Sequence, residues 1–193
     1  MCLGFFQTYW EQGQLPEIPQ HGRVLEIGCA EANWLTPMKV ARPDLTLIGI
    51  DQRDPGGREG ADEIIIADVM TYQGFAPASF DAIIAVSMVE WAGTGKYNSP
   101  VDERGDVLTM QQARKWIKPD GWLYFDVPYE NAQFPKEHRK HNPEMRIYDD
   151  DLFAQLFILS HWRVESRQFF DGWMSETQRH PDGPYMAHVL RPR

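Results

Sequence analysis

The stretch Val24-Leu25-Glu26-Ile27-Gly28-Cys29-Ala30 decides the fold, because a short apolar run ends there in a turn of small residues. Gly28 permits a tight turn, and the small side chains that follow let a ligand approach the main chain closely. A helix that begins after such a turn offers main-chain N–H groups to an anionic part of a ligand. The stretch therefore predicts the first strand of a sheet that binds its ligand at the carboxyl ends of the strands.

Short apolar runs of this kind recur along the chain and alternate with helical patterns. Each is rich in Val, Ile or Leu and is bounded by Gly, Pro or Asp, which is typical of parallel strands covered on both faces. The predicted strands are residues 23–27, 45–50, 63–67, 81–87 and 122–127, followed by two further β-rich runs at 162–170 and 185–190. We expect the last two runs to close the sheet as an antiparallel pair.

Helices are predicted where apolar residues recur on one helical face. Residues 106–118 form one such helix, and residues 149–160 form another that begins with three acidic side chains. A shorter helix capped by Asn33 or Thr36 follows the first strand, whereas residues 51–64 contain Pro and Gly and leave little room for a helix. This order predicts an α/β fold with a doubly wound, mostly parallel seven-stranded sheet whose last strand is antiparallel.

Length and composition favour a soluble enzyme-sized domain. The 193 residues suffice for one buried core, so we expect a single domain over residues 1–193. Residues 1–20 form either a lid or a packing segment, and the shared helical face of Phe6, Tyr9 and Trp10 favours packing. The formal net charge of −9 opposes nucleic-acid binding. No apolar run approaches the roughly 20 residues of a membrane span, so we expect a cytoplasmic protein.

Carboxylates stand at the predicted ends of three strands. Asp51 follows the second strand, where it can accept hydrogen bonds from both hydroxyls of a ribose. Asp68 and Val69 follow the third strand and can hold the amino edge of an adenine. Glu26 lies inside the first strand, so its burial requires a polar partner, either the ammonium group of a ligand or a basic side chain of the protein.

These residues resemble the motifs of class I S-adenosylmethionine-dependent methyltransferases, which have a Rossmann-like sheet. Over residues 21–190, Glu26 and Gly28 match the first motif ExGxGxG, while Ala30 and Ala32 replace its second and third glycines. The resemblance implies that S-adenosylmethionine is the cofactor. The cofactor contacts that it implies are Glu26, Gly28, Ala30, Asp51, Asp68, Val69 and the main chain near Ser87 and Met88.

A narrower resemblance covers the chain from Ser87 to Gly121. The segments 87–97, 100–102 and 105–106 and the turn at 118–121 are similar to the pattern SxEHxGLGRYGDPxDPxGD of a methyltransferase-like group, the domain-of-unknown-function 268 type. Trp91 replaces the His of that pattern, Lys96 the Arg, and Asn98-Ser99 the Gly-Asp. The fold survives these changes, but a catalytic role does not carry over to Trp91.

The acceptor of the methyl group is expected beside residues 128–148, a long connection after the fifth strand. In an acidic protein its basic side chains indicate either a small anionic or sugar-like acceptor or a solvated loop of mixed charge; they are Lys136, His138, Arg139, Lys140, His141 and Arg146. His138 and His141 are candidate general bases, and Glu90 and Tyr129 are further catalytic candidates. We expect no metal site, because no zinc-type set accompanies the two histidines.

Three other functions remain open from the residues alone. The chain is either an active methyltransferase or a catalytically inactive cofactor-binding module of the same fold, since several consensus residues are replaced. A nicotinamide oxidoreductase fits less well, because Ala30 and Asn33 break the GxGxxG fingerprint. A nucleic-acid methyltransferase is disfavoured by the acidic charge. The oligomeric state is not predicted.

Overall fold

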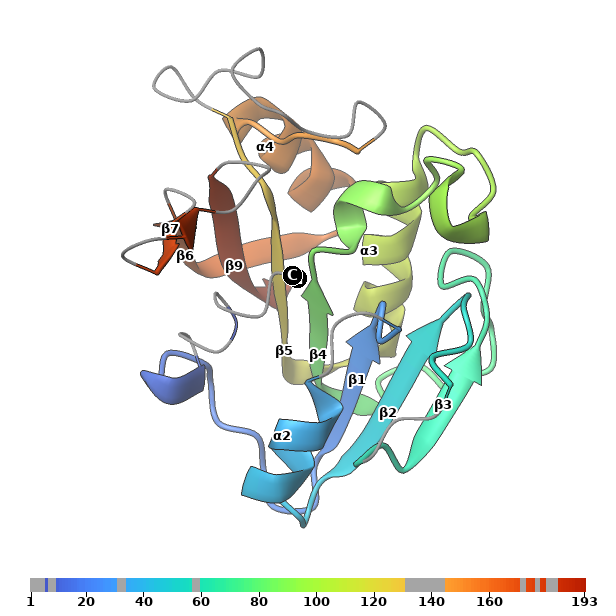
Figure 1. The fold of residues 1–193 in the computed structure, drawn as a ribbon, viewed down its shortest axis with the longest axis vertical. Helices are drawn as coiled ribbons and strands as arrows, with labels where there is room; N and C mark the ends of the chain where they lie inside the picture. The colour runs from blue at the N-terminus through green and yellow to red at the C-terminus, as the bar shows by residue number, and fades with distance from the viewer. Residues whose placement is uncertain are drawn as a thin grey trace.

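A mixed seven-stranded sheet organises the molecule (Figure 1). The computed structural model describes residues 6, 10–30, 34–56, 60–130, 145–170, 173–175, 178–179 and 184–193. The strand order is β3-β2-β1-β4-β5-β9-β6, and β1 to β5 run parallel while β9 is antiparallel to both of its neighbours. The predicted fold class is confirmed, with the reversed strand lying between β5 and β6.

The strands agree closely with the apolar runs. Their bounds are β1 Arg23–Ile27, β2 Thr46–Asp51, β3 Glu63–Ile66, β4 Phe80–Val86, β5 Ile117–Pro128, β6 Trp162–Phe170 and β9 Tyr185–Pro192. β5 begins five residues earlier than predicted, because Ile117 already pairs with Phe80 across a register shift. A small separate pair, β7 Trp173–Ser175 and β8 Gln178–Arg179, lies between β6 and β9 in the sequence.

Helices cover both faces of the sheet, as the term doubly wound requires. α3 (Gly105–Trp116) and α4 (Asp150–Leu159) pack on one face with the inward side chains of β5. α2 (Leu35–Ala41) packs on the other face together with Phe6, which lies between Trp34 and Tyr124. The buried Phe6 supports the packing role expected for the N-terminal aromatic residues, whereas Tyr9 lies outside the described residues.

Two details of the predicted helices are corrected. The N-cap of α2 is Trp34, which makes no side-chain capping hydrogen bond; Thr36 lies inside the helix, and Asn33 lies outside the described residues. α3 ends at Trp116 rather than Lys118, because the chain enters β5 at Ile117 before it reaches Pro119. No helix occurs in the described parts of residues 51–64, as predicted.

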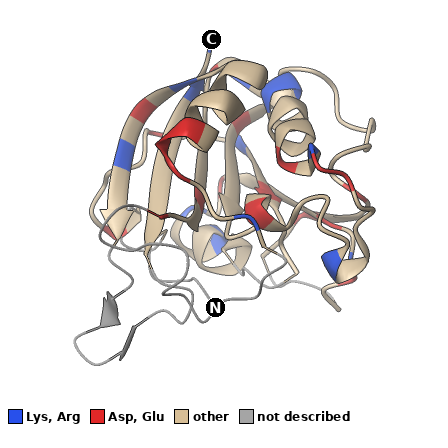
Figure 2. Ribbon diagram, turned by 90° about the horizontal axis from the view of Figure 1, so that it is seen from above, with Lys and Arg blue, Asp and Glu red and all other residues tan. Residues whose placement is uncertain are grey.

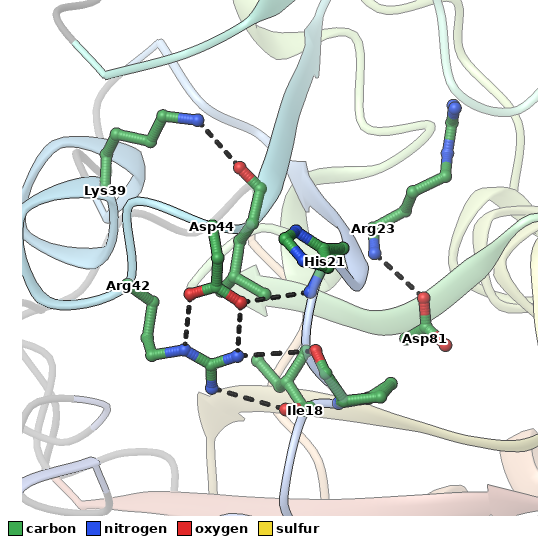
Figure 3. Close-up of polar contacts among 9 residues, drawn as sticks. Ile18, His21, Arg23, Lys39, Arg42, Asp44 and Asp81 are labelled. Carbon is green, nitrogen blue, oxygen red and sulfur yellow. Dashed lines mark hydrogen bonds and ion pairs between the residues drawn. The ribbon is translucent and has the colours of Figure 1, made fainter.

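The two ends of the sheet differ in their polar residues. The amino end carries paired charges such as Arg42 with Asp44 (Figure 3). The carboxyl end is viewed from above in Figure 2, which shows acidic segments in red on the elements around it. Two short 3-10 helices, η1 (Val89–Trp91) and η2 (Lys96–Asn98), follow β4 at this end. No helix in the described parts of the chain is long and apolar enough to cross a membrane.

His188 is buried in the core between these two ends. Its ring stacks on Phe125 and lies against Phe153 and Phe157 of α4. Burial lowers the pKa of His188 to about 3, with a smaller contribution from the positive charge of Arg167. The imidazole is therefore neutral at physiological pH and acts as a core side chain.

Candidate functional site

The turns after β1 and β4 touch each other at Gly28. The residue has a positive φ of 82°, and its N–H donates to the carbonyl of Ile50 on β2 at 2.8 Å. A Cβ atom at this position would lie 2.6 Å from Cγ of Met88, which is closer than side chains tolerate. Glycine is therefore needed both for the turn and for the approach of Met88. The predicted residues Gly28 and Met88 are brought together.

Asp51 connects the first turn to the end of β2. Its Oδ2 accepts a hydrogen bond from the Ala30 N–H at 3.0 Å, and its Oδ1 accepts one from the Arg53 N–H at 2.9 Å. The guanidinium of Arg53 also pairs with the carboxylate at 3.3 Å and lies over the ring of Tyr97. The side chain of Asp51 is nearly buried. A carboxylate is thus fixed beside the small-residue turn, where the sequence predicts a ribose.

Asp68 and Val69 lie at the end of β3, next to Asp51. The N–H of Ala67 donates to the carbonyl of Asp51 at 2.9 Å, which joins the two strand ends. Oδ1 of Asp68 accepts from the N–H of Met70 at 3.0 Å, so the side chain closes its own turn. Val69 and Met70 are buried beneath this turn. The predicted adenine-binding residues therefore share one edge of the sheet with the predicted ribose-binding carboxylate.

Glu26 is fully buried in β1, and its Oε1 accepts from the N–H of Trp34 at the N-cap of α2 at 3.3 Å. The carboxylate therefore lies at the beginning of this helix, where backbone N–H groups lack helical partners. This contact supplies part of the polar partner that the sequence requires for Glu26. It also joins β1 to α2 on the face opposite α3.

Ser87, at the end of β4, is held by side chains from three other elements. Its N–H donates to Oδ1 of Asp126 at 2.9 Å, and its hydroxyl donates to Oε1 of Glu90 at 2.6 Å. The hydroxyl of Tyr185 lies 3.3 Å from Ser87 Oγ. Glu90, Asp126 and Tyr185 are buried, whereas Ser87 is only half-buried. Ser87 is therefore the member of this cluster that can meet a ligand.

Asp126 is the functional candidate that the sequence analysis missed. It lies within an apolar strand, and burial raises its pKa to about 7 despite hydrogen bonds from Tyr124 and Ser87 that act in the opposite direction. A polar residue in the run Trp122–Val127 was the available signal. By the reasoning applied to Glu26, an acid in an otherwise apolar strand indicates a polar partner.

Of the remaining catalytic candidates, Tyr129 lies in the described part of the chain, whereas His138 and His141 lie outside the described residues. The ring of Tyr129 stacks on Phe153, and burial, together with the nearby charge of Asp150, raises the pKa of its phenol. A phenol of raised pKa is a proton donor rather than a base at neutral pH. Among the residues that the structure describes, no group of three His, Cys, Asp or Glu side chains is placed to hold a metal ion.

Arg146 binds the loop that follows β4, and this contact corrects the role that the sequence predicts for it. Its guanidinium donates to the carbonyls of Ala92, Asp102 and Glu103. We expected Arg146 to attract an anionic acceptor, but its N–H groups bind main-chain oxygens because the loop of residues 92–105 folds back around them. The glycines of this loop are required as well, since a Cβ on Gly93 would lie 2.2 Å from the carbonyl oxygen of Asp102.

Comparisons with known proteins agree with this geometry. The sequence profile of a methyltransferase domain matches residues 11–178. The chain belongs to this methyltransferase-domain family. It is an S-adenosylmethionine-dependent methyltransferase of class I, and S-adenosylmethionine is its cofactor. Family membership favours the enzyme over the non-catalytic module and the nicotinamide oxidoreductase considered from the sequence.

Solved structures with the same fold are distant in sequence. An S-adenosylmethionine-dependent methyltransferase from Mesorhizobium loti is 12% identical, with 95% of this chain and 97% of that chain covered and a TM-score of 0.64. The 1,6-didemethyltoxoflavin N1-methyltransferase of Burkholderia thailandensis is 14% identical (95% and 74% covered, TM-score 0.64). The geranyl diphosphate C-methyltransferase of Streptomyces coelicolor is 7% identical (97% and 79% covered, TM-score 0.70). No curated protein sequence matches the chain.

The residues of the carboxyl end fit the cofactor. S-adenosylmethionine carries a ribose with two hydroxyls and a positive sulfonium, and the site presents carboxylates to both kinds of group. Asp51 supplies an acceptor beside the glycine turn, while Glu26, Glu90 and Asp126 place acidic groups below the ends of β1, β4 and β5. Buried carboxylates favour a cationic ligand because their attraction is little screened by water.

Proposed function

We propose that this methyltransferase transfers the methyl group of S-adenosylmethionine to a small, anionic or sugar-like acceptor. The observation that carries the proposal is the fixed Asp51 carboxylate beside Gly28 and Ala30, which is suited to a nucleoside. Two structural neighbours act on small molecules, namely 1,6-didemethyltoxoflavin and geranyl diphosphate, and the second of these is an anion. The net charge of −9 argues against a nucleic-acid acceptor.

The cofactor would lie across the ends of β1, β2, β3 and β4. In this proposal Asp51 binds the ribose hydroxyls, and Asp68 with Val69 binds the adenine edge. Gly28 and Ala30 allow the backbone to approach the ligand, and Glu26 lies near its methionine end. Ser87 and Met88 bind the methionine end from the β4 side. Each of these residues lies at a strand end or at the turn that follows it.

The reaction is an in-line displacement in which the acceptor oxygen or nitrogen attacks the methyl group. The cofactor supplies an activated methyl with a neutral thioether as the leaving group. The protein holds the two reactants in line and excludes water, which supplies much of the acceleration. Where the acceptor carries a proton, Glu90 and Tyr129 are the described candidates for the base, and the raised pKa of the Tyr129 phenol disfavours Tyr129 in that role.

Residues 128–148 are proposed to line the acceptor side of the site, with His138 and His141 as further candidates for the base. The segment follows β5, and its last described residues contact the loop after β4, since the N–H of Arg146 donates to the carbonyl of Glu90 at 3.0 Å. The narrower resemblance to the domain-of-unknown-function 268 group supports the same assignment. In this structure that motif builds the loop of residues 92–105 next to Glu90.

Two measurements test the proposal in sequence. Isothermal titration calorimetry with S-adenosylmethionine and S-adenosylhomocysteine measures binding directly. Transfer of a labelled methyl group is then followed with small carboxylic acids, nucleotide-linked sugars and RNA as separate acceptor pools. Labelling of a small-acceptor pool is expected. Binding without transfer to any pool would contradict the acceptor assignment, and labelling of RNA alone would replace it.

A further inference from the structure

Ser87 adopts a backbone conformation that a non-glycine residue rarely takes. Its φ of 47° lies in the left-handed region, at the junction between β4 and η1. A side chain in this region costs free energy, and the conformation persists only where surrounding contacts enforce it. The contacts that enforce it here identify the residues on which the shape of the turn depends.

Asp126 supplies the contacts to the backbone of this turn. The N–H of Ser87 donates both to Oδ1 of Asp126 at 2.9 Å and to the carbonyl of Asp126 at 3.2 Å. The second carboxylate oxygen accepts from the hydroxyl of Tyr124 at 2.8 Å. Since Asp126 is fully buried, hydrogen bonds are its only compensation for lost hydration. One of these bonds reaches directly into the proposed cofactor site.

The side chain of Ser87 is fixed independently of its backbone. Its hydroxyl donates to Glu90 of η1, which leaves the hydroxyl of Tyr185 on β9 to donate to Ser87 Oγ. Ser87 is thus oriented from β5, η1 and β9 at once. On the other side of the turn, the side chain of Met88 lies against Gly28. A change in the Ser87 turn would therefore move both proposed contacts to the methionine end.

We propose that Asp126 is a positioning residue of the cofactor site, which acts through Ser87 by holding the left-handed turn at the end of β4 in its binding shape. The inference rests on the proposed function, because Ser87 and Met88 are assigned there to the methionine end. Asp126 does not touch the ligand in this proposal. Its contribution is the conformation of the residue that does.

The ionised form of Asp126 holds the turn more strongly than the neutral form, because a charged acceptor makes the stronger hydrogen bond. Burial raises the pKa of Asp126 to about 7, so the hydrogen bond that its carboxylate accepts from the Ser87 N–H strengthens as pH rises through this value. Four titratable groups lie on elements next to Asp126 or on the same face of the sheet. They are Tyr124 of β5, Glu90 of η1, Tyr185 of β9 and Glu26 of β1.

The experiment measures the affinity of the full chain for S-adenosylhomocysteine by calorimetry. Asp126→Ala is expected to weaken binding roughly tenfold, the usual effect of losing one hydrogen bond to a charged group. Asp81→Asn is the matched control at the opposite end of the sheet, since Asp81 also accepts from a main-chain N–H, that of Arg23 at 2.8 Å, and from Lys118 at 2.7 Å. The control should bind like the parent.

A rescue separates positioning from general structural damage. Glycine adopts a positive φ without strain, so Asp126→Ala should cost much less affinity in a Ser87→Gly chain, compared with Ser87→Gly alone, than it costs in the parent. With Asp126→Asn, which keeps an acceptor but cannot ionise, the affinity should no longer rise with pH between 6 and 8 as it does in the parent. Circular dichroism confirms that each variant is folded.

The outcomes discriminate between the two proposals. Equal affinity of Asp126→Ala and the parent would overturn the positioning role, and so would an Asp126→Ala loss that is just as large in the Ser87→Gly background. A parent chain that binds neither S-adenosylhomocysteine nor S-adenosylmethionine would overturn the proposed function itself, and this inference with it. Binding by the parent together with loss and rescue in the variants supports both.

Discussion

Asp44 at the amino end of the sheet and Asp126 towards its carboxyl end are buried and paired in opposite ways. At the amino end, Asp44 accepts two hydrogen bonds from the guanidinium of Arg42, both 2.8 Å, and one from the N–H of His21 (Figure 3). These contacts hold the pKa of Asp44 well below its usual range. At the carboxyl end, Asp126 is fully buried, accepts from a hydroxyl and a main-chain N–H, and has a raised pKa.

This difference indicates that the acids of the amino end serve the stability of the fold, whereas the buried acid at the carboxyl end serves the site. The ion pairs of the amino end are partly exposed, and such pairs contribute little and are screened by salt. Carboxylates such as Asp126 are costly to bury even with hydrogen bonds, and a raised pKa of this kind is typical of functional sites.

The largest effect concerns the pH dependence of stability through Asp126. Its pKa is raised from 3.8 to about 7 in the folded chain, so the folded state binds more protons than the unfolded state between these values. The contribution of Asp126 to the free energy of unfolding is fully present below about pH 4 and is lost as pH rises to 7. Three pKa units correspond to about 4 kcal/mol. Asp126→Asn should remove this decline in the free energy of unfolding, measured by denaturant titration from pH 5 to 8.

Tyr124→Phe provides the control for that titration. The Tyr124 hydroxyl donates to the Asp126 carboxylate and lowers its pKa, so removing the hydroxyl should shift the decline to higher pH without abolishing it. A parent chain whose stability is flat across this range would contradict the contrast between the two ends. Asp126 would then be solvated like an ordinary surface acid.

The second effect is on cofactor affinity through Asp51. Asp51→Ala removes the proposed acceptor for the ribose hydroxyls and the bond to the Ala30 N–H, so affinity for S-adenosylhomocysteine should fall roughly a hundredfold. Asp54→Ala is the matched control, because this acid lies three residues away, is exposed and accepts a hydrogen bond from the N–H of Gly56. Unchanged calorimetric affinity of Asp51→Ala would remove the ribose assignment.

The third effect tests the close approach of the β1 and β4 turns. Gly28→Ala combines a positive φ with a Cβ atom only 2.6 Å from Cγ of Met88, and it should lower the free energy of unfolding by about 2 kcal/mol. Gly56→Ala has a positive φ of 70°, but no heavy atom of the described residues lies within 4 Å of the added Cβ, so it isolates the backbone contribution of about 1 kcal/mol. Equal losses in the two variants would mean that the Met88 contact adds nothing.

The sequence predicted the fold and the site residues that lie at the strand ends. Strand ends are marked by local signals, namely an apolar run followed by Gly28, Asp51 or Asp68, and these residues lie where the pattern placed them. The role of Asp126 depends on the pairing of β5 with β4, which brings Asp126 beside Val86 and its carboxylate to Ser87, thirty-nine residues away in the sequence. Arg146 likewise appeared basic and available until the fold brought three carbonyls to it. The periodicity of the sequence could not predict these contacts between segments that are distant along the chain.

The smallest effect concerns the ion pair between Lys39 and Asp62 at the amino end. Lys39 donates to the Asp62 carboxylate at 2.9 Å and to the carbonyl of Leu45 at 2.7 Å, and the Asp62 side chain is 41% exposed. Lys39→Met keeps most of the aliphatic stem, so it should lower the free energy of unfolding by about 0.5–1 kcal/mol, and less at high salt. Affinity for S-adenosylhomocysteine should not change. A loss of affinity comparable to that of Asp51→Ala would show that charges at the amino end reach the site, and the separation of stability from function between the two ends would fail.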